Sequence, residues 1–117
     1  IQKNYFSPGG LFDVVEDDGG QIVGMAGLFA KGNGECELRK MYLLPQMRGR
    51  GLGRRLLERM LGEARRRGFT RMELETSSKL VEAIRLYKRN GFHIVFTKHD
   101  KNPLASYHRM VKDIGNS

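Results

Sequence analysis

The chain has 117 residues, of which 39% are hydrophobic and 29% are charged, a composition typical of one soluble globular domain and not of a disordered protein. Its apolar runs fall far short of the ~20 residues that a membrane-spanning helix needs, and its single cysteine excludes an internal disulfide and a multi-cysteine zinc site. The net charge of +8 predicts an anionic partner, and because nine arginines fall between Arg48 and Arg71, the charge indicates a local anion site.

The first part of the chain alternates short apolar segments with turn residues. Residues 1–10 are interpreted as an entry segment that closes in a Pro-Gly-Gly loop. Strands are predicted in this part at residues 11–16, 21–30 and 35–44, joined by Asp-Asp-Gly-Gly and Lys-Gly-Asn-Gly hairpin turns. Simple alternation along the third strand puts a set of side chains on one face, namely Glu35, Glu37, Arg39, Met41 and Leu43.

After Pro45 the apolar spacing becomes helical. Helices are predicted over residues 51–67 and 80–90, each stopped by a glycine, and the second carries an apolar stripe of Leu80, Ala83, Ile84 and Tyr87. Further strands are predicted at residues 71–76, 92–97 and 106–111. The order β-β-β-α-β-α-β-β predicts an α/β fold with a mixed, mostly antiparallel sheet. Its central βαβ unit makes strands 35–44 and 71–76 parallel through a right-handed crossover.

The segment between the third strand and the first helix carries the clearest chemical signal. It opens a helix, where backbone N–H groups lack partners and the helix dipole is positive. Glycines at positions 49, 51 and 53 let the backbone approach a ligand, and arginines gather there at positions 48, 50, 54 and 55. Cations at the positive end of a dipole are unfavourable unless an anion sits among them, so the segment predicts a diphosphate site.

Phosphate-loop patterns differ in their spacing. A Walker loop needs a Lys followed by Ser or Thr, which this segment lacks. A dinucleotide loop needs G-x-G-x-x-G, whereas this one has G-x-G-x-G. Glu73 and Glu75 lie at a suitable distance for a ribose contact, which keeps the dinucleotide pattern open, but that pattern expects a doubly wound parallel sheet.

A third pattern fits better. Arg48-x-x-Gly51-x-Gly53 resembles the R/Q-x-x-G-x-G/A acetyl-CoA loop of the GCN5-related N-acetyltransferase (GNAT) superfamily. Residues 37–45 (ELRKMYLLP) resemble the family's fourth strand, and residues 83–92 (AIRLYKRNGF) are similar to its A-x-x-L-Y-x-x-x-G-F signature. The resemblance spans roughly residues 11 to 111 and implies a single GNAT-type domain over residues 1–117. The family's first strand and two helices, expected ahead of residue 11, are mostly missing, so the domain is N-terminally incomplete.

The resemblance implies acetyl transfer from acetyl-CoA to a primary amine, with no metal. Main chain at Met41 and Leu43 would hold the pantetheine arm, and the Leu43 N–H would polarise the thioester carbonyl. Backbone N–H groups of the loop would hold the pyrophosphate, and its residues are Arg48, Gly49, Arg50, Gly51, Leu52, Gly53 and Arg54.

Catalytic groups also follow from the resemblance. Tyr87 matches the acid that protonates the departing CoA thiolate, because a phenol with a pKa of about 10 keeps its proton at neutral pH. Glu37 and Glu75 both stand where family members carry the base, and the sequence does not choose between them. The asparagine often found after the fifth strand is absent, and Ser77 or Ser78 stands in its place.

The sequence also bears on the acceptor, the partners and the cellular location. A basic rim disfavours polyamines and aminoglycosides, which predicts an amine that also carries a carboxylate, such as an amino-acid-like compound or a peptide. A non-catalytic acyl-CoA-binding sensor is the alternative function. The sequence gives little support for a nucleic-acid partner and predicts no membrane association. The lone cysteine suits a cytoplasmic location, and a homodimer is compatible with the sequence.

Overall fold

A computed structural model describes residues 2–7 and 10–115, and it has the predicted α/β architecture. Seven strands form one sheet in the order β1-β2-β3-β4-β5-β7-β6, with every neighbouring pair antiparallel except β4 and β5. The strands are β1 (Gln2–Ser7), β2 (Gly10–Glu16), β3 (Ile22–Gly32), β4 (Glu35–Leu43), β5 (Arg71–Ser77), β6 (His93–Lys98) and β7 (Tyr107–Asp113). The helices are α1 (Leu52–Arg66) and α2 (Val81–Arg89), with short 3-10 turns at Pro45–Met47 and Pro103–Ala105. Neither helix combines the length and apolar character needed to cross a bilayer.

The first strand corrects the sequence analysis. Residues 2–7, interpreted as an entry segment to which no strand was assigned, form β1, which pairs antiparallel with β2 from Gln2 opposite Val15 to Ser7 opposite Gly10. An edge strand needs only one pairing partner, and the polar sequence QKNYFS shows no apolar alternation that would reveal it. The expected Pro-Gly-Gly loop falls mostly on residues 8–9, outside the described residues.

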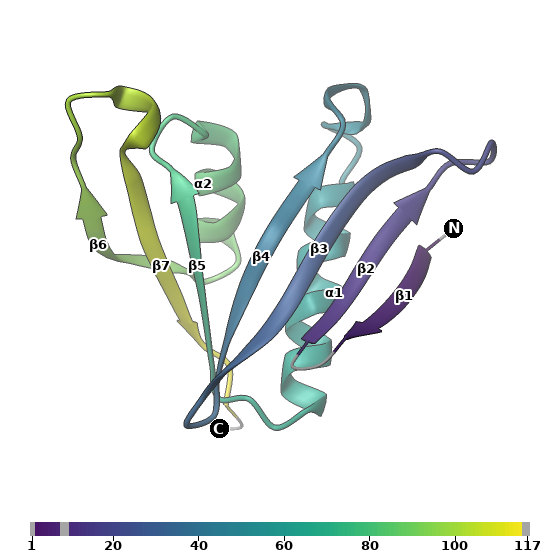
Figure 1. Cartoon of the computed structure of the whole chain (residues 1–117), viewed down its shortest axis with the longest axis horizontal. Coiled ribbons are helices and arrows are strands. Elements are labelled where there is room, and N and C mark those ends of the chain that lie inside the picture. The colour runs from purple at the N-terminus through teal and green to yellow at the C-terminus, as the bar shows by residue number, and fades with distance from the viewer. Residues whose placement is uncertain (1, 8–9, 116–117) are drawn as a thin grey trace.

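Both helices pack on one face of the sheet, where they lie behind the strands in Figure 1. The apolar side of α1 supplies Leu57 and Met60 to the main core, where they meet Leu74 and Met110 from the strands. We call the opposite side of the sheet the open face, because no helix of the described residues covers it. The helix α2 begins one residue later than expected, and Leu80, predicted in its apolar stripe, is 52% exposed ahead of it.

A β-bulge in β4 also corrects the sequence analysis. Met25 lies opposite Tyr42 and Gly27 opposite Arg39, so one residue of β3 faces two of β4, and Lys40 has a φ of 55°. The extra residue reverses the alternation. Met41 therefore packs against the core on the helix side. Leu43, opposite Gly24, follows it there, whereas Glu37 stays on the open face.

The strands β4 and β5 pair only over their first residues. Four parallel pairs join them, from Glu35 opposite Arg71 to Leu38 opposite Leu74. Beyond these pairs the strands diverge, as Figure 1 shows. We call this unpaired part, residues 39–43 of β4 and 75–77 of β5, the splay. It gives the sheet an interruption directly before the loop that leads into α1.

Candidate active site

The loop from β4 to α1 has the geometry of an anion cradle. Gly49 and Gly51 have φ values of 79° and 75°, and a Cβ built on either would have no atom within 4 Å. Gly51 is the N-cap of α1 without a side-chain cap, and the first turn contains no acidic residue. The first backbone bond of the helix runs from the Arg55 N–H to the Gly51 carbonyl. The N–H groups of residues 52–54 therefore remain directed out of the helix end, where an anion would accept them.

The loop arginines differ in their surroundings. Arg48 donates from Nε to the Leu43 carbonyl at 3.2 Å, which ties the loop to the end of β4. Arg54 pairs with Glu58 at 2.6 Å, one turn along the helix. Arg50 and Arg55 are exposed and form no ion pair with a described residue. At least two of the four predicted cations are therefore available to an anion at the helix end.

Backbone groups of β4 point into the splay. The Leu44 N–H donates to the Val23 carbonyl of β3 at 2.9 Å. Because successive backbone groups of a strand point to opposite sides, the Leu43 N–H is directed away from β3 and toward β5. Pairing with β5 has ended by this point, so the described strands leave that donor to the splay. An extended ligand lying there would pair with it as a strand would.

Tyr87 lies on the helix side of the sheet. It is 6% exposed in α2, and its ring meets that of Phe92 edge-on at a centroid distance of 5.8 Å. Burial raises the pKa of Tyr87 to about 12, because the phenolate would lose its hydration. The hydroxyl therefore stays protonated and remains a hydrogen-bond donor throughout the physiological range.

The buried phenol and thiol predict a loss of stability in alkali. Burial also raises the pKa of Cys36 to about 12. Each group has a higher pKa in the folded state than in the unfolded state. Its contribution to the free energy of unfolding is therefore complete below the unfolded-state pKa and is lost as the pH rises through the folded-state pKa. Between pH 10 and 12 each group should lower the unfolding free energy by about 1.4 kcal/mol per pH unit. Urea unfolding of Tyr87→Phe and Cys36→Ala should show a shallower decline than the wild type, and parallel declines would contradict the assignment.

Both candidate carboxylates lie on the open face. Glu37 is held by Arg39 at 2.8 Å and sits beside the last paired residues of β4 and β5. Glu75 lies within the splay, with its side chain 44% exposed and Oε2 3.4 Å from a terminal nitrogen of Arg109. Glu75 is therefore the better placed of the two to meet a ligand from solvent.

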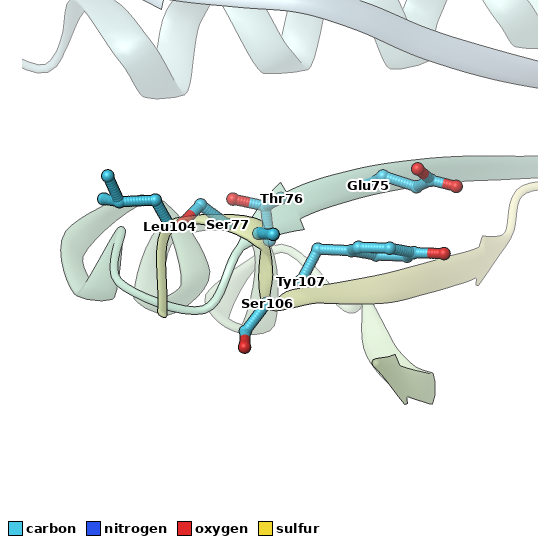
Figure 2. A pocket seen from close by; sticks show the side chains of 7 residues that line it. Glu75, Thr76, Ser77, Leu104, Ser106 and Tyr107 are labelled. Carbon is cyan, nitrogen blue, oxygen red and sulfur yellow. The ribbon is translucent and has the colours of Figure 1, made fainter. Parts of the chain in front are cut away.

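A hollow of about 260 Å³ adjoins Glu75 on the β7 side. Its lining comes from the end of β5 and the segment before and into β7, namely Glu75, Thr76, Ser77, Leu104, Ala105, Ser106 and Tyr107. Figure 2 shows the Glu75 side chain and the Tyr107 ring extending side by side in one direction. The hollow thus combines one carboxylate, several hydroxyls and an apolar wall, and it lies directly beside the splay.

Sequence reasoning missed Arg109 and Tyr107. They lie more than 25 residues from Glu75 in sequence, and only the pairing of β5 with β7 brings them together. The serine at position 78, considered as a replacement for the absent asparagine, donates instead from its N–H and hydroxyl to the Ser106 carbonyl at 3.1 and 3.4 Å. It therefore fastens the two loops that border the hollow.

Comparisons with known proteins agree with this fold. The acetyltransferase (GNAT) family model matches residues 2–92. Escherichia coli YjgM, described as an uncharacterized N-acetyltransferase, is 44% identical over 97% of this chain and 70% of its own length. The aminoalkylphosphonate N-acetyltransferase of Salmonella typhimurium is 37% identical over 68% of this chain and 56% of its own. The solved ribosomal-protein-S18-alanine N-acetyltransferase of Escherichia coli superposes with a TM-score of 0.83 over 96% of this chain and 74% of its own, at 23% identity.

Proposed function

This chain belongs to the acetyltransferase (GNAT) family, and on that basis we propose that it moves the acetyl group of acetyl-CoA to the primary amine of an amino-acid-like small molecule or a peptide. The observation that carries the proposal is the splay, which ends immediately before the loop that opens α1. Acetyl-CoA has an extended arm with a diphosphate at one end and a thioester at the other. An unpaired strand edge next to an anion cradle matches that shape.

The loop would hold the diphosphate through its main chain. The N–H groups at the start of α1 point at the position of the phosphates, and Arg50 and Arg55 supply charge. Gly49 and Gly51 have positive φ values, which favour glycine, and because glycine has no side chain this space stays open. Met41 and Leu43 are apolar on the helix side, where the pantetheine arm would run along β4 toward the splay.

The two sides of the sheet have different tasks in this proposal. Glu75 on the open face takes the proton that an ammonium group must lose before its nitrogen attacks the acetyl carbonyl. The Leu43 N–H stabilises the charge that develops on the carbonyl oxygen. Tyr87, on the helix side, donates its hydroxyl proton toward the departing sulfur. Amine and cofactor thus approach from opposite faces and meet at the splay.

The acceptor class follows from the hollow. Glu75 attracts an ammonium group, Tyr107 and Leu104 offer apolar contact, and Arg109 would repel a second cation. The name of the Salmonella relative describes an acceptor that combines an amine with an acidic group, which supports the same class here. We place the reaction in the cytoplasm, where the buried thiol of Cys36 stays reduced.

A matched pair of loop variants tests the cofactor site. Gly51→Ala puts a methyl group at positive φ in the open cradle, and we expect it to weaken acetyl-CoA binding about 10- to 100-fold in isothermal titration. Gly53→Ala places its Cβ 3.4 Å from Leu43 and Leu86, which is ordinary contact. It keeps the backbone donor and should add roughly 1 kcal/mol of helix stability without weakening binding.

The pair also separates a cradle from a general effect on folding. Both variants should give circular dichroism spectra like that of the wild type. Equal affinities for wild type and Gly51→Ala, or no binding of acetyl-CoA to the wild type at millimolar concentration, would refute the proposed cofactor site. Binding without thiol release for any amine would favour the acyl-CoA sensor instead.

A further inference from the structure

Arg109 is fixed in position but keeps part of its guanidinium available. Its Nε lies 3.0 Å from a carboxylate oxygen of Glu73, whose other oxygen pairs with Lys31. The guanidinium carbon lies 5.4 Å from the centroid of the Phe96 ring. A guanidinium has five N–H donors in a planar fork, and these two contacts engage only one edge and one face. One of its terminal nitrogens lies near Glu75 on the open face.

The contact between Arg109 and Glu75 is of a different kind. The terminal nitrogen and the carboxylate oxygen are 3.4 Å apart, and the two side chains are 38% and 44% exposed. Such exposed pairs contribute little stability, so a ligand can replace either partner. The residues face each other directly across β5 and β7, and Glu75 is part of the hollow beside the splay. One positive and one negative group therefore stand together at the amine site.

We propose that Arg109 and Glu75 together bind the zwitterion of a free α-amino acid. This inference rests on the proposed function and narrows its acceptor from amino-acid-like compounds and peptides to free α-amino acids. The substrate ammonium pairs with Glu75 and its carboxylate with Arg109, so each protein group exchanges one ionic partner for another. An α-amino acid has its two charged groups about as far apart as those of the protein pair. A peptide N-terminus lacks the adjacent carboxylate and is a poorer fit.

The wall of the hollow selects the side chain. Leu104 is 76% exposed at its rim, and the Tyr107 ring lies 6.2 Å from that of Phe96 on the same face. These groups gain from contact with an apolar or aromatic side chain. L-Phenylalanine, and for comparison L-phenylalaninamide, which has the same amine without the negative charge, are therefore suitable probes.

The experiment measures thiol release from acetyl-CoA with both probes at low and high salt. The wild type should have a KM for phenylalanine about 10-fold or more below that for phenylalaninamide. Arg109→Met should raise the KM for phenylalanine about 10- to 100-fold, leave that for phenylalaninamide within about threefold, and change kcat little. Arg109→Lys should recover part of the loss as a point charge without the planar fork.

Arg39 provides the matched control. It too pairs with a glutamate on the open face, Glu37, and its guanidinium carbon lies 4.8 Å from the centroid of the Phe29 ring. Arg39 belongs to β4, however, whereas Arg109 belongs to β7. Arg39→Met should leave the preference for phenylalanine over phenylalaninamide unchanged. The inference is overturned if the wild type does not prefer the acid, if Arg109→Met affects both probes equally, or if Arg39→Met causes the selective loss. If the wild type does not prefer the acid but still acetylates the amide, the proposed acetyltransferase function is retained. If no amine gives thiol release, the proposed function is refuted as well.

Discussion

Replacing Glu75 with glutamine should lower kcat about 10²- to 10³-fold at neutral pH, because the substrate ammonium then has no carboxylate to take its proton. Glutamine keeps the size of the side chain, and Arg109 retains its contact with Glu73, so the fold and the position of the guanidinium should be preserved. Acetyl-CoA affinity should be unchanged, since Glu75 lies on β5 whereas the backbone donors of the cofactor loop lie at the start of α1. Stopped-flow or steady-state thiol release measures the loss.

The pH dependence of this variant identifies the role. As the pH approaches the pKa of the free amine, the substrate sheds its own proton, so the defect should shrink toward alkaline pH. Glu37→Gln is the control, because Glu37 is already held by Arg39 beside the last paired residues. A large, pH-dependent defect in Glu37→Gln with near-normal activity in Glu75→Gln would assign the base to Glu37 instead.

Tyr87→Phe should lower kcat by about 10²-fold while KM for both substrates changes little. The variant removes the hydroxyl proposed to protonate the leaving sulfur and keeps the ring that packs against Phe92, so folding should be close to normal. Because the pKa of Tyr87 is about 12, the wild type should show no alkaline decline from this group below about pH 11.

Tyr42→Phe is the matched control for the loss of a phenol. Tyr42 is 46% exposed on the open face, where its ring lies 5.9 Å from the Arg48 guanidinium. It should retain wild-type kcat. Equal activities of Tyr87→Phe and wild type would remove Tyr87 from the reaction, and an alkaline limb near pH 9 that Tyr87→Phe abolishes would contradict its raised pKa.

Local sequence patterns were sufficient for most of the fold. Glycines after each helix, hairpin turns and alternating apolar residues predicted both helices, six of the seven strands and the parallel pairing of β4 with β5. The loop at residues 48–54 was selected as a candidate site because closely spaced glycines and clustered arginines at a helix start are typical of an anion site. These patterns lie within short stretches of chain, so they can be recognised without knowledge of the tertiary structure.

Features that depend on pairing between strands were not predictable. The bulge at Lys40 changes the face of Met41 and Leu43, yet nothing in KMYLL distinguishes a bulge from regular alternation. β1 is polar and is recognised only by its pairing with β2. Arg109 joins Glu75 through the register of β5 and β7. For the same reason the sequence could not choose between two carboxylates whose difference lies in their distance from the splay.

We infer that the splay and the loop before α1 make this chain an amine-dependent acetyltransferase. To test this, the wild-type protein is mixed with isotope-labelled acetyl-CoA and a panel of amino acids and short peptides, and the label is followed by mass spectrometry. We expect labelled N-acetyl products that form together with free CoA, with free amino acids acetylated faster than peptides. Bound acetyl-CoA that remains intact in the presence of every amine would show that the chain binds the cofactor without transferring its acetyl group, and would refute the inference.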